Sequence, residues 1–479
     1  MSKPVMSKAV MSEPALTIDG KREAIQGVPI HRTLLQHLRL TGRVGTKEGC
    51  AEGDCGACTV AMIAAGSDSR PRYQAVNSCL IPLVALADRQ VVTASGLSRG
   101  DDLHPVQAAM VRLGGSQCGY CTPGFVMSLF AAYYNRELDD HAVEGNLCRC
   151  TGYLPIRRAI ASLGEPASDD PFRQVLEQAP LGRSALHYRW NGSVFSRPTS
   201  LAEVIALLTE HPDARLIAGG TDLGVEISKF HRRFPLLVSL EAVPELGVVE
   251  DTPDYLEIGA GVPLSHIEGR LAGTFPALDE MLRWFAARQI RNRATLGGNL
   301  GTASPIGDLP PVLLSLDARV MATGPTGERS LPMATFFPDY RQTALTAGEI
   351  IRAIRIPKGL PKGATNRLAQ AYKVGKRGTD DISIVAAAFT IDLDVEARVV
   401  QARLSYGGVA PTPVRASDVE ELLVGRPWNS VTVREAAAAL RQAFSPISDH
   451  RGSAAYRRAL AGNLFIKFHH QMSGKRVAS

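Results

Sequence analysis

Eight cysteines are the residues of this sequence whose type and spacing most clearly allow chemistry. They all lie between Cys50 and Cys150, and residues 151–479 contain none. No apolar leader follows the first lysines, which disfavours structural disulfides, because reducing compartments keep thiols free for metals or catalysis. The cysteines therefore predict a metal-binding N-terminal third followed by a chemically different remainder.

The first four cysteines have the spacing Cys50-x4-Cys55-x2-Cys58, with Cys79 after twenty intervening residues. This is the plant-type spacing of a [2Fe–2S] cluster. Glycines in the loop over residues 45–58 let it bend around a cluster and turn backbone N–H groups toward the sulfurs. A zinc site is the alternative, since Cys-x2-Cys pairs alone allow one. The x4–x2 triplet in so glycine-rich a loop favours iron and sulfide.

The second four cysteines form two close pairs, Cys118-x2-Cys121 and Cys148-x-Cys150. Their spacing is less diagnostic, and a zinc-stapled helical bundle stays open on these residues alone. A Cys-x-Cys pair is tight for one tetrahedral metal but suits a two-iron rhomb. Thr122-Pro123 predicts a helix start directly after Cys121, which would turn the positive end of that helix toward a negatively charged cluster.

Two glycine-rich loops follow the cysteines. Leu216-Ile217 leads into Ala218-Gly219-Gly220-Thr221-Asp222-Leu223, where glycines let backbone amides approach a pyrophosphate closely. The loop over residues 295–305 combines glycines with Asn, Thr and Ser side chains that can bind phosphate or ribose oxygens. Either loop alone is more often a tight turn, and no G-x-G-x-x-G supports a Rossmann site. Together, after two one-electron carriers, they favour a flavin, which accepts electrons singly and releases a hydride.

Length and composition set the frame for these sites. A chain of 479 residues predicts two to four domains. The content of 45% hydrophobic and 21% charged residues is typical of soluble globular protein. A net charge of +6, without basic blocks interleaved with aromatics, gives no support for nucleic-acid binding, and no apolar run reaches the length of a membrane span. We expect a cytoplasmic protein whose first fifteen residues are a disordered extension, with Met6 or Met11 as alternative starts.

Periodicity and turn residues predict the elements that position these groups. Helices are expected between residues 104 and 163, with prolines in their first turns, and Glu165–Leu186 reads as an exposed linker. Strands then alternate with helices to about residue 360, and a last segment over 366–475 begins with strands and ends helical. The further expected elements are a hairpin of Leu16–Ile18 with Val28–Ile30, a helix over Arg32–Leu40, and strands at Thr59–Ile63, Ile384–Leu393 and Ala402–Tyr406.

Four strings in this order resemble the iron–sulfur half of the molybdenum hydroxylases, the family of xanthine dehydrogenases and aldehyde oxidases. They are GTKEGCAEGDCGACTV (45–60), NSCL (77–80), QCGYCTPG (117–124) and GNLCRCTGY (145–153). Every cysteine ligand of that family has a cysteine here. AGGTDL (218–223) and RNRATLGGNLGTASPIGDLPP (291–311) resemble the FAD domains of xanthine dehydrogenase and of carbon monoxide dehydrogenase flavoproteins. The resemblance covers residues about 15 to 475.

The resemblance implies a multidomain α+β fold. The implied domains are a β-grasp ferredoxin-like [2Fe–2S] domain (15–98), a four-helix [2Fe–2S] domain (99–165), a linker (166–190), a two-part α+β FAD-binding domain of the vanillyl-alcohol-oxidase (PCMH) type (191–362) and a C-terminal α+β domain like that of carbon monoxide dehydrogenase flavoproteins (363–475).

The resemblance also implies roles for single residues. Phe285 would lie beside the isoalloxazine ring, Lys373 near that ring and Asp380 near the nicotinamide entrance. The alternatives are an ordinary core phenylalanine and charges on a solvated loop. The implied ligands of the two [2Fe–2S] clusters are Cys50, Cys55, Cys58, Cys79, Cys118, Cys121, Cys148 and Cys150. The implied FAD contacts are Leu216, Ile217, Ala218, Gly219, Gly220, Thr221, Asp222, Leu223, Phe285, Ala294, Thr295, Gly298, Asn299, Gly301, Thr302, Asp308 and Lys373.

Nothing in the sequence resembles a molybdopterin domain, and this organisation resembles the small subunit of bacterial two-gene xanthine dehydrogenases. It implies a large molybdopterin-binding partner carrying the molybdenum cofactor, in an α2β2 heterotetramer, which hydroxylates hypoxanthine and xanthine. Electrons would leave through FAD to NAD⁺, and no residue of this chain would act as acid or base on the purine. The same relay for an aldehyde or N-heterocycle hydroxylase, a stand-alone NADH diaphorase or redox sensor, and a zinc-stapled nucleotide-binding protein are the alternatives.

Overall fold

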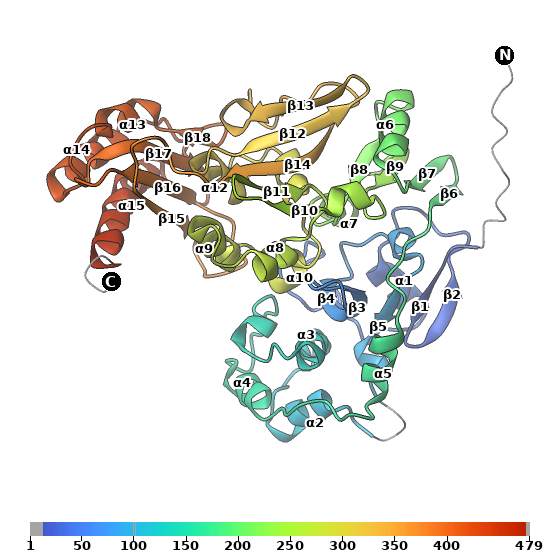
Figure 1. The fold of residues 1–479 in the computed structure, drawn as a ribbon. Coiled ribbons are helices and arrows are strands. Elements are labelled where there is room, and N and C mark those ends of the chain that lie inside the picture. Colours follow the sequence, from blue (N-terminus) through green and yellow to red (C-terminus); the bar gives the residue numbers. More distant parts are fainter. Residues whose placement is uncertain (1–12, 99, 101, 476–479) are drawn as a thin grey trace, which may run out of the picture. The chain divides into compact units, whose positions relative to one another are not determined.

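The computed structural model describes residues 13–98, 100 and 102–475, and these fall into two compact units. Unit 1 holds the described residues up to Arg197 together with Gly220–Ala242, and unit 2 holds Pro198–Gly219 and the described residues from Val243 on. Met6 and Met11 lie outside the described residues. Both units mix helices with sheets, as the predicted α+β class requires (Figure 1). No helix in the described ranges is long and apolar enough to cross a membrane.

Unit 1 begins with a five-stranded sheet in the order β2-β1-β5-β3-β4. The parallel pairing of β1 with β5 among otherwise antiparallel neighbours gives the predicted β-grasp arrangement. Helix α1 buries three leucines at helical spacing, and a reciprocal capping box between Thr33 and Gln36 fixes its start. The bounds are β1 (Ala15–Ile18), β2 (Lys21–Ala24), α1 (Leu34–Leu40), β3 (Thr59–Ala65), β4 (Pro71–Asn77) and β5 (Gln90–Val92).

The first hairpin differs from its prediction in its second strand. β2 begins at Lys21, and the predicted strand Val28–Ile30 forms no strand. Asp19 and Gly20 both have positive φ, at 51° and 79°, and make a two-residue turn whose twist matches the flanking strands. Asp-Gly is the strongest short-range hairpin signal in a sequence, so the correct register was present in the residues.

In the helical part of unit 1, three described α-helices each begin with a proline in the first turn, as predicted. The 14-residue α3 is buried along most of its length and packs against β3 and β4 (Figure 1). The bounds are α2 (Pro105–Arg112), α3 (Thr122–Asn135), the 3-10 turn η3 (Asp140–Val143) and α4 (Leu154–Ala161).

The segment expected as a linker is partly ordered into regular structure. It contains helix α5 (Pro171–Gln178) and strand β6 (Leu186–Trp190). Asp170 caps α5 by accepting from two backbone N–H groups, and it also accepts a hydrogen bond from Tyr134 Oη at 2.8 Å. No residue of α5 is fully buried, but Phe172 and Leu176 pack against the hydrophobic core of the helical part, so the segment is neither irregular nor exposed throughout.

The rest of unit 1 follows β6 in sequence. Strand β7 pairs antiparallel with β6 and parallel with β9, which explains why Gly220–Ala242 belongs to unit 1 while the rest of the predicted FAD domain belongs to unit 2. The bounds are β7 (Ser193–Arg197), α7 (Leu223–Ser228) and β9 (Leu236–Ser239).

Unit 2 contains two sheets, in the orders β10-β11-β14-β12-β13 and β15-β16-β17-β18. Helix α12 packs against β16 and β17, and α9 packs against β15. The second sheet and the last helices enclose an aromatic core around Phe389, Phe465 and Phe468. The first half comprises α6 (Leu201–Glu210), β8 (Arg215–Ile217), η4 (Pro244–Gly247), β10 (Val249–Asp251), β11 (Tyr255–Gly259), α8 (Leu264–Arg270), α9 (Pro276–Trp284), α10 (Arg288–Arg291), α11 (Leu296–Gly301) and α12 (Leu309–Ser315). The second half comprises β12 (Arg319–Gly324), β13 (Gly327–Pro332), β14 (Ile350–Pro357), β15 (Asn366–Val374), β16 (Val385–Leu393), β17 (Val399–Gly407), β18 (Val414–Arg415), α13 (Ser417–Leu423), α14 (Ser430–Leu440) and α15 (Ala454–Lys475).

Candidate iron–sulfur and flavin sites

The first four predicted ligands lie together as two close pairs in the ferredoxin-like part of unit 1. Cys55 is in side-chain hydrogen-bonding contact with Cys50, and Cys79 with Cys58. The two pairs also interact electrostatically, since Cys50 acts on both Cys58 and Cys79. Cys58 and Cys79 are buried, at 2% and 1% exposure.

Backbone donors surround the Cys50 sulfur. The N–H groups of Asp54 and Cys55 donate to Sγ at 3.3 Å each, and that of Glu52 donates at 3.5 Å. The Cys55 thiol and these donors lower the pKa of Cys50 to about 5. Gly53 has φ of 88°, a left-handed conformation that favours glycine and lets the loop present its amides inward. The donors thus stabilise negative charge on the sulfur, as a thiolate ligand requires.

The second four predicted ligands also lie as two close pairs, at the start of α3 and before α4. Cys121 is in hydrogen-bonding contact with Cys148, and Cys118 with Cys150. Burial opposes ionisation of Cys148, but the hydroxyl and N–H of Thr151, at 3.2 and 3.4 Å from its Sγ, outweigh it and lower its pKa. Cys118 and Cys150 are exposed, in contrast to the buried pair of the first set.

The paired arrangement of the sulfurs can be compared with the donor set of a two-iron cluster. Among the described residues, no group of three or more His, Cys, Asp or Glu side chains is placed to hold one metal ion. Each cysteine set offers two pairs of sulfurs, and a [2Fe–2S] rhomb takes one pair on each iron. The four sulfurs of each set therefore fit the donor set of a two-iron cluster.

Two backbone segments of the predicted flavin site meet in unit 2. Arg293 Nε donates to the Gly219 carbonyl at 3.2 Å, and a Cβ built on Gly219 would lie 1.7 Å from the Arg293 carbonyl oxygen. Only glycine fits there. Burial lowers the pKa of Arg293 to about 10. The structure thus brings Gly219 next to Ala294 through an arginine that the sequence had not singled out, while the contacts of both residues with FAD stay predictions.

Residues 220–223 continue the same loop but belong to unit 1. Gly220 has φ of 78°, and its carbonyl accepts the Gly224 N–H at 2.7 Å as α7 begins. A Cβ on Gly224 would lie 2.3 Å from the Leu80 carbonyl oxygen, within unit 1. The loop therefore has glycine-dependent contacts at both of its ends.

The glycines of the second loop have different duties. Gly297 packs against the turn after β11, where its Cβ would lie 2.5 Å from that of Ala260. Gly298 and Gly301 are exposed, and a Cβ on Gly301 would meet nothing within 4 Å. Thr295 caps α11 by accepting from the Gly298 N–H at 3.0 Å.

Within the described residues, one buried polar atom of this loop has no hydrogen-bond partner. The Asn299 Oδ1 is buried and accepts no hydrogen bond there, while Thr302 Oγ1 donates to the Asn299 carbonyl at 2.8 Å. A buried acceptor without a donor costs about 1–3 kcal/mol, which a bound ligand can relieve. Open glycine backbone beside such an acceptor fits a polar cofactor such as FAD.

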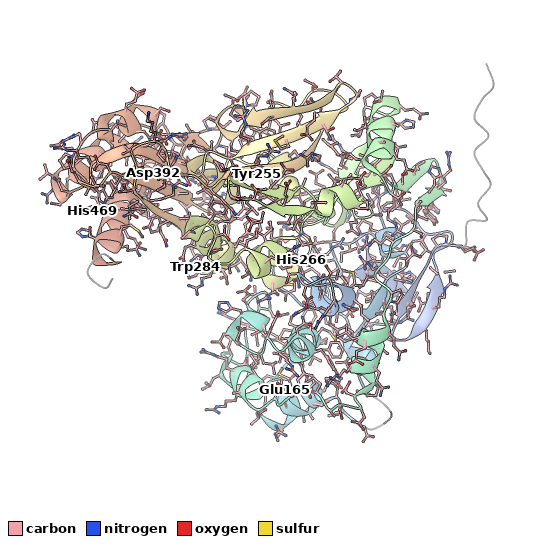
Figure 2. The ribbon with its side chains drawn as sticks, viewed as in Figure 1. Glu165, Tyr255, His266, Trp284, Asp392 and His469 are labelled. Carbon is pink, nitrogen blue, oxygen red and sulfur yellow. The ribbon has the colours of Figure 1, made fainter. Side chains whose placement is uncertain are left out.

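Lys373, predicted near the flavin ring, and Asp308, predicted as a further FAD contact, form a buried ion pair. Lys373 Nζ lies 2.8 Å from Asp308 Oδ2 and also donates to the Trp284 carbonyl at 3.0 Å. Ser383 Oγ, which the sequence did not single out, donates to Asp308 Oδ1 at 2.5 Å. Strand β15 is thereby tied to the start of α12, and Figure 2 labels Trp284 at the end of α9.

Phe285 follows Trp284 and is half-buried, neither a fully packed core residue nor an open one. Arg291 Nη1 donates to the carbonyls of Phe285 and Ala286 at 2.9 and 3.1 Å, and Ala286 has φ of 45°.

Asp380 also has positive φ, at 60°, and its carbonyl accepts from Arg377. The turn around it is organised by the neighbouring Asp381, which accepts from the N–H groups of Arg377 and Ile382. The roles of Phe285 and Asp380 stay predictions.

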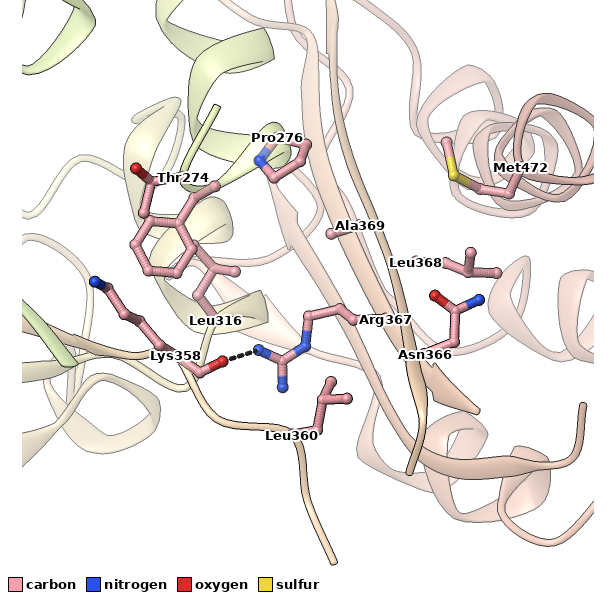
Figure 3. A pocket seen from close by; sticks show the side chains of 11 residues that line it. Thr274, Pro276, Leu316, Lys358, Leu360, Asn366, Arg367, Leu368, Ala369 and Met472 are labelled. Carbon is pink, nitrogen blue, oxygen red and sulfur yellow. Dashed lines mark hydrogen bonds between the residues drawn. The ribbon is translucent and has the colours of Figure 1, made fainter. Parts of the chain in front are cut away.

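A pocket of about 630 Å³ in unit 2 lies apart from these residues (Figure 3). Its lining includes Phe275, Leu316 and Met472 but no residue predicted to contact flavin. Arg367 projects into it but already pairs with the fully buried Asp392, through Nε at 2.7 Å from Oδ1, and donates to the Lys358 carbonyl at 3.4 Å. Lys358 also lines the pocket and already pairs with Asp251, so neither of these two described cations is free for a phosphate.

Four family models match the chain in consecutive order. They are a 2Fe-2S iron-sulfur cluster binding domain (16–84), a [2Fe-2S] binding domain (93–161), the FAD binding domain in molybdopterin dehydrogenase (188–359) and the CO dehydrogenase flavoprotein C-terminal domain (370–472). The chain belongs to the molybdenum hydroxylase family. It therefore carries iron–sulfur and FAD domains, and the predicted multidomain α+β fold is confirmed.

Relatives of the family align with nearly the whole chain. A xanthine dehydrogenase from Emericella nidulans is 35% identical over 95% of this chain, and one from Drosophila pseudoobscura is 34% identical over 97%. The chain spans only 38% and 39% of the length of those two relatives.

Two solved structures match more than half of the chain. Quinoline 2-oxidoreductase from Pseudomonas putida 86 has a TM-score of 0.54 at 28% identity, covering 59% of this chain and 98% of that one. Carbon monoxide dehydrogenase from Hydrogenophaga pseudoflava has a TM-score of 0.53 at 28% identity, covering 57% and 94%.

Proposed function

We propose that this chain is the electron-relay subunit of a xanthine dehydrogenase, joining a partner's molybdenum centre to NAD⁺. The observation that carries the proposal is the union of two complete four-cysteine sets with a flavin domain in a chain that aligns with xanthine dehydrogenases over 95% of its length. When bound, the clusters carry single electrons and the flavin collects them for delivery as a hydride.

The chain's own residues hold and insulate these groups. The eight cysteines supply the thiolates, and the N–H groups around Cys50 stabilise their charge. Gly219 lets the two loops approach each other, Gly301 leaves open backbone for FAD, and Asn299 Oδ1 accepts a hydrogen bond from FAD. The Lys373–Asp308 pair places a buried ammonium beside the residue pair Trp284–Phe285, where the ring is expected.

The second cysteine set is the side that we assign to the molybdenum partner. Cys118 and Cys150 are exposed. Two aromatic side chains close to them in sequence, Tyr120 and Tyr153, are also exposed, at 51% and 37%. Exposed aromatic side chains of this kind are enriched at protein interfaces. A large molybdopterin-binding subunit in an α2β2 assembly is the partner that would cover them.

A relay for another hydroxylase is the second candidate. It is favoured by the structural neighbours, which are named quinoline 2-oxidoreductase and carbon monoxide dehydrogenase. Turnover of xanthine, compared with aldehydes and N-heterocycles, in the native complex separates the two candidates. A native protein without a large partner or molybdenum would leave a stand-alone NADH diaphorase.

Cys148→Ser tests the relay directly. We expect xanthine-dependent NAD⁺ reduction to fall to background in the complex, because one ligand of the second set is lost, while FAD stays bound and is still reduced by NADH. Steady-state assays in both directions and flavin absorbance measure this. Unchanged xanthine-dependent reduction of NAD⁺ in the variant would contradict the proposed electron relay.

A further inference from the structure

The two cysteine sets meet at a joint made of Gly56, Gly124 and Asn146, all in unit 1. Gly56 lies between Cys55 and Cys58, Gly124 lies in the first turn of α3 after Cys121, and Asn146 lies two residues before Cys148. Each member of the joint is therefore within three residues of a predicted cluster ligand, and the three come from three separate segments.

Hydrogen bonds connect the segments across the joint. Asn146 Nδ2 donates to the Gly56 carbonyl at 3.0 Å, and the Leu147 N–H donates to the Cys55 carbonyl at 3.0 Å. The second bond joins a ligand of the first set to the residue directly before Cys148. The path from Cys55 to Cys148 thus consists of one hydrogen bond and a few covalent bonds.

The joint has no spare room. A Cβ on Gly124 would lie 2.2 Å from the Gly56 carbonyl oxygen, and a Cβ on Gly56 would lie 2.1 Å from the Gly145 carbonyl oxygen. Real Cβ atoms essentially never approach closer than 3.0 Å, and backbone atoms cannot rotate away. Any side chain at Gly124 therefore has to move α3 away from the loop of the first set.

A buried side-chain network holds Asn146 in place. Asn146 is 2% exposed, and its Oδ1 accepts from Ser128 Oγ at 2.6 Å. Ser128 lies on α3 and is also 2% exposed, and Asn146 Nδ2 additionally lies 3.4 Å from Thr59 Oγ1 at the start of β3. One amide thus ties α3, the first cysteine loop and the segment before Cys148 together.

We propose that Asn146, clasped between Gly56 and Gly124, is a positioning residue that sets the separation of the two cysteine sets. Electron transfer between carriers falls steeply with their distance, so a joint with no slack keeps this exchange fast and uniform. The inference rests on the proposed function only in taking both sets to hold [2Fe–2S] clusters. It does not depend on the partner, on xanthine or on NAD⁺.

The test measures the magnetic coupling between the clusters in the full chain with both clusters and FAD bound. After reduction with dithionite, the splitting of the electron paramagnetic resonance lines reports the distance between two reduced clusters. We expect Gly124→Ala to narrow the splitting while each cluster keeps its own g values and iron content. Gly164→Ala is the matched control, because its Cβ would meet nothing within 4 Å, and it should keep the parent splitting.

Ser128→Ala provides a milder change that leaves the backbone alone. It removes the hydrogen bond that orients the Asn146 amide, so we expect a smaller narrowing and a broader spread of splittings. Parent splitting in Gly124→Ala with both clusters present would overturn the proposal. If Gly124→Ala does not fold, parent splitting in Ser128→Ala overturns it. If the parent complex does not turn over xanthine, the proposed function is wrong, but the result on the separation of the two clusters still holds.

Discussion

The cysteine sets of unit 1 and the flavin segments of unit 2 present their binding atoms in different ways. In unit 1 the atoms are side-chain sulfurs, so the residue type itself is the site. In unit 2 the predicted binding atoms are backbone groups of two glycine loops and the buried amide oxygen of Asn299. A sulfur site is broken by changing one atom, whereas a backbone site is broken by adding one.

The largest effect should come from one methyl group in unit 2. Gly219→Ala would place Cβ 1.7 Å from the Arg293 carbonyl oxygen, so the two flavin loops must separate. We expect FAD content to fall at least tenfold while iron and sulfide contents stay at the parent level. Flavin absorbance after gel filtration and iron analysis measure both quantities.

Two other glycines sharpen this prediction. Gly247→Ala, whose Cβ would meet nothing within 4 Å, should keep its FAD. Gly301→Ala also has open space in the protein, so any loss of FAD there reports contact with the cofactor and not a steric clash within the chain. Full FAD binding by Gly219→Ala would show that contact between residues 219 and 293 does not shape the site.

The same difference explains what the sequence could and could not predict. The cysteine ligands could be predicted because sulfur ligation demands one residue type at nearly fixed spacing. The structure brings together the cysteines of each set, while their role as ligands stays a prediction. The pairing of Cys121 with Cys148 could not be predicted, because two close pairs can combine in more than one way. The family of the chain and its α+β fold class were predicted from the sequence strings around the cysteines, and both are confirmed.

The flavin site was predictable only as a pair of glycine loops. The long-range partners, Arg293 for Gly219 and Ser383 for Asp308, depend on tertiary contacts that periodicity does not encode. Arginine and serine at such positions are ordinary surface residues in most sequences. The helix α5 was missed for another reason, since prolines and acidic residues in that segment suggested a linker while Asp170 and Pro171 are also a cap and a first turn.

Within unit 1, burial should decide how much each cysteine contributes to stability. Cys79→Ser and Cys118→Ser each remove one ligand, so each should reduce bound iron from about four to about two atoms per chain. Only Cys79 is fully buried, and a serine hydroxyl there would have to be satisfied in the sheet core. We expect the free energy of unfolding to fall by about 1–3 kcal/mol more for Cys79→Ser than for Cys118→Ser.

Iron analysis and urea unfolding followed by circular dichroism measure this difference. Cys118→Ala, which leaves no hydroxyl, should unfold like Cys118→Ser because position 118 is exposed. Equal losses of stability for Cys79→Ser and Cys118→Ser would mean that cluster loss alone, and not burial, sets the cost.

The smallest predicted effect is a difference between the units in acid. In unit 1, burial lowers the pKa of His104 to about 4, and its Nδ1 caps α2 by accepting from the Val106 N–H at 3.2 Å. In unit 2, the hydrogen bond from Arg329 lowers the pKa of Glu349 to about 2. His104 binds its proton more readily when unfolded, so its contribution is complete above about pH 6.5 and is lost as pH falls toward 4. The contribution of Glu349 is lost only below about pH 4.5.

Between pH 7 and pH 5, therefore, His104 should cost unit 1 about 2 kcal/mol while the Glu349 pair costs unit 2 almost nothing. His104→Asn keeps a side-chain oxygen at the helix cap but cannot take up a proton. We expect the advantage of the parent over this variant, measured by urea unfolding, to be smaller at pH 5 than at pH 7. Arg329→Gln should show no such change over this range, because Glu349 stays ionised in both states. An advantage of the parent over His104→Asn that is constant from pH 7 to pH 5 would mean that His104 is not held neutral in the folded chain.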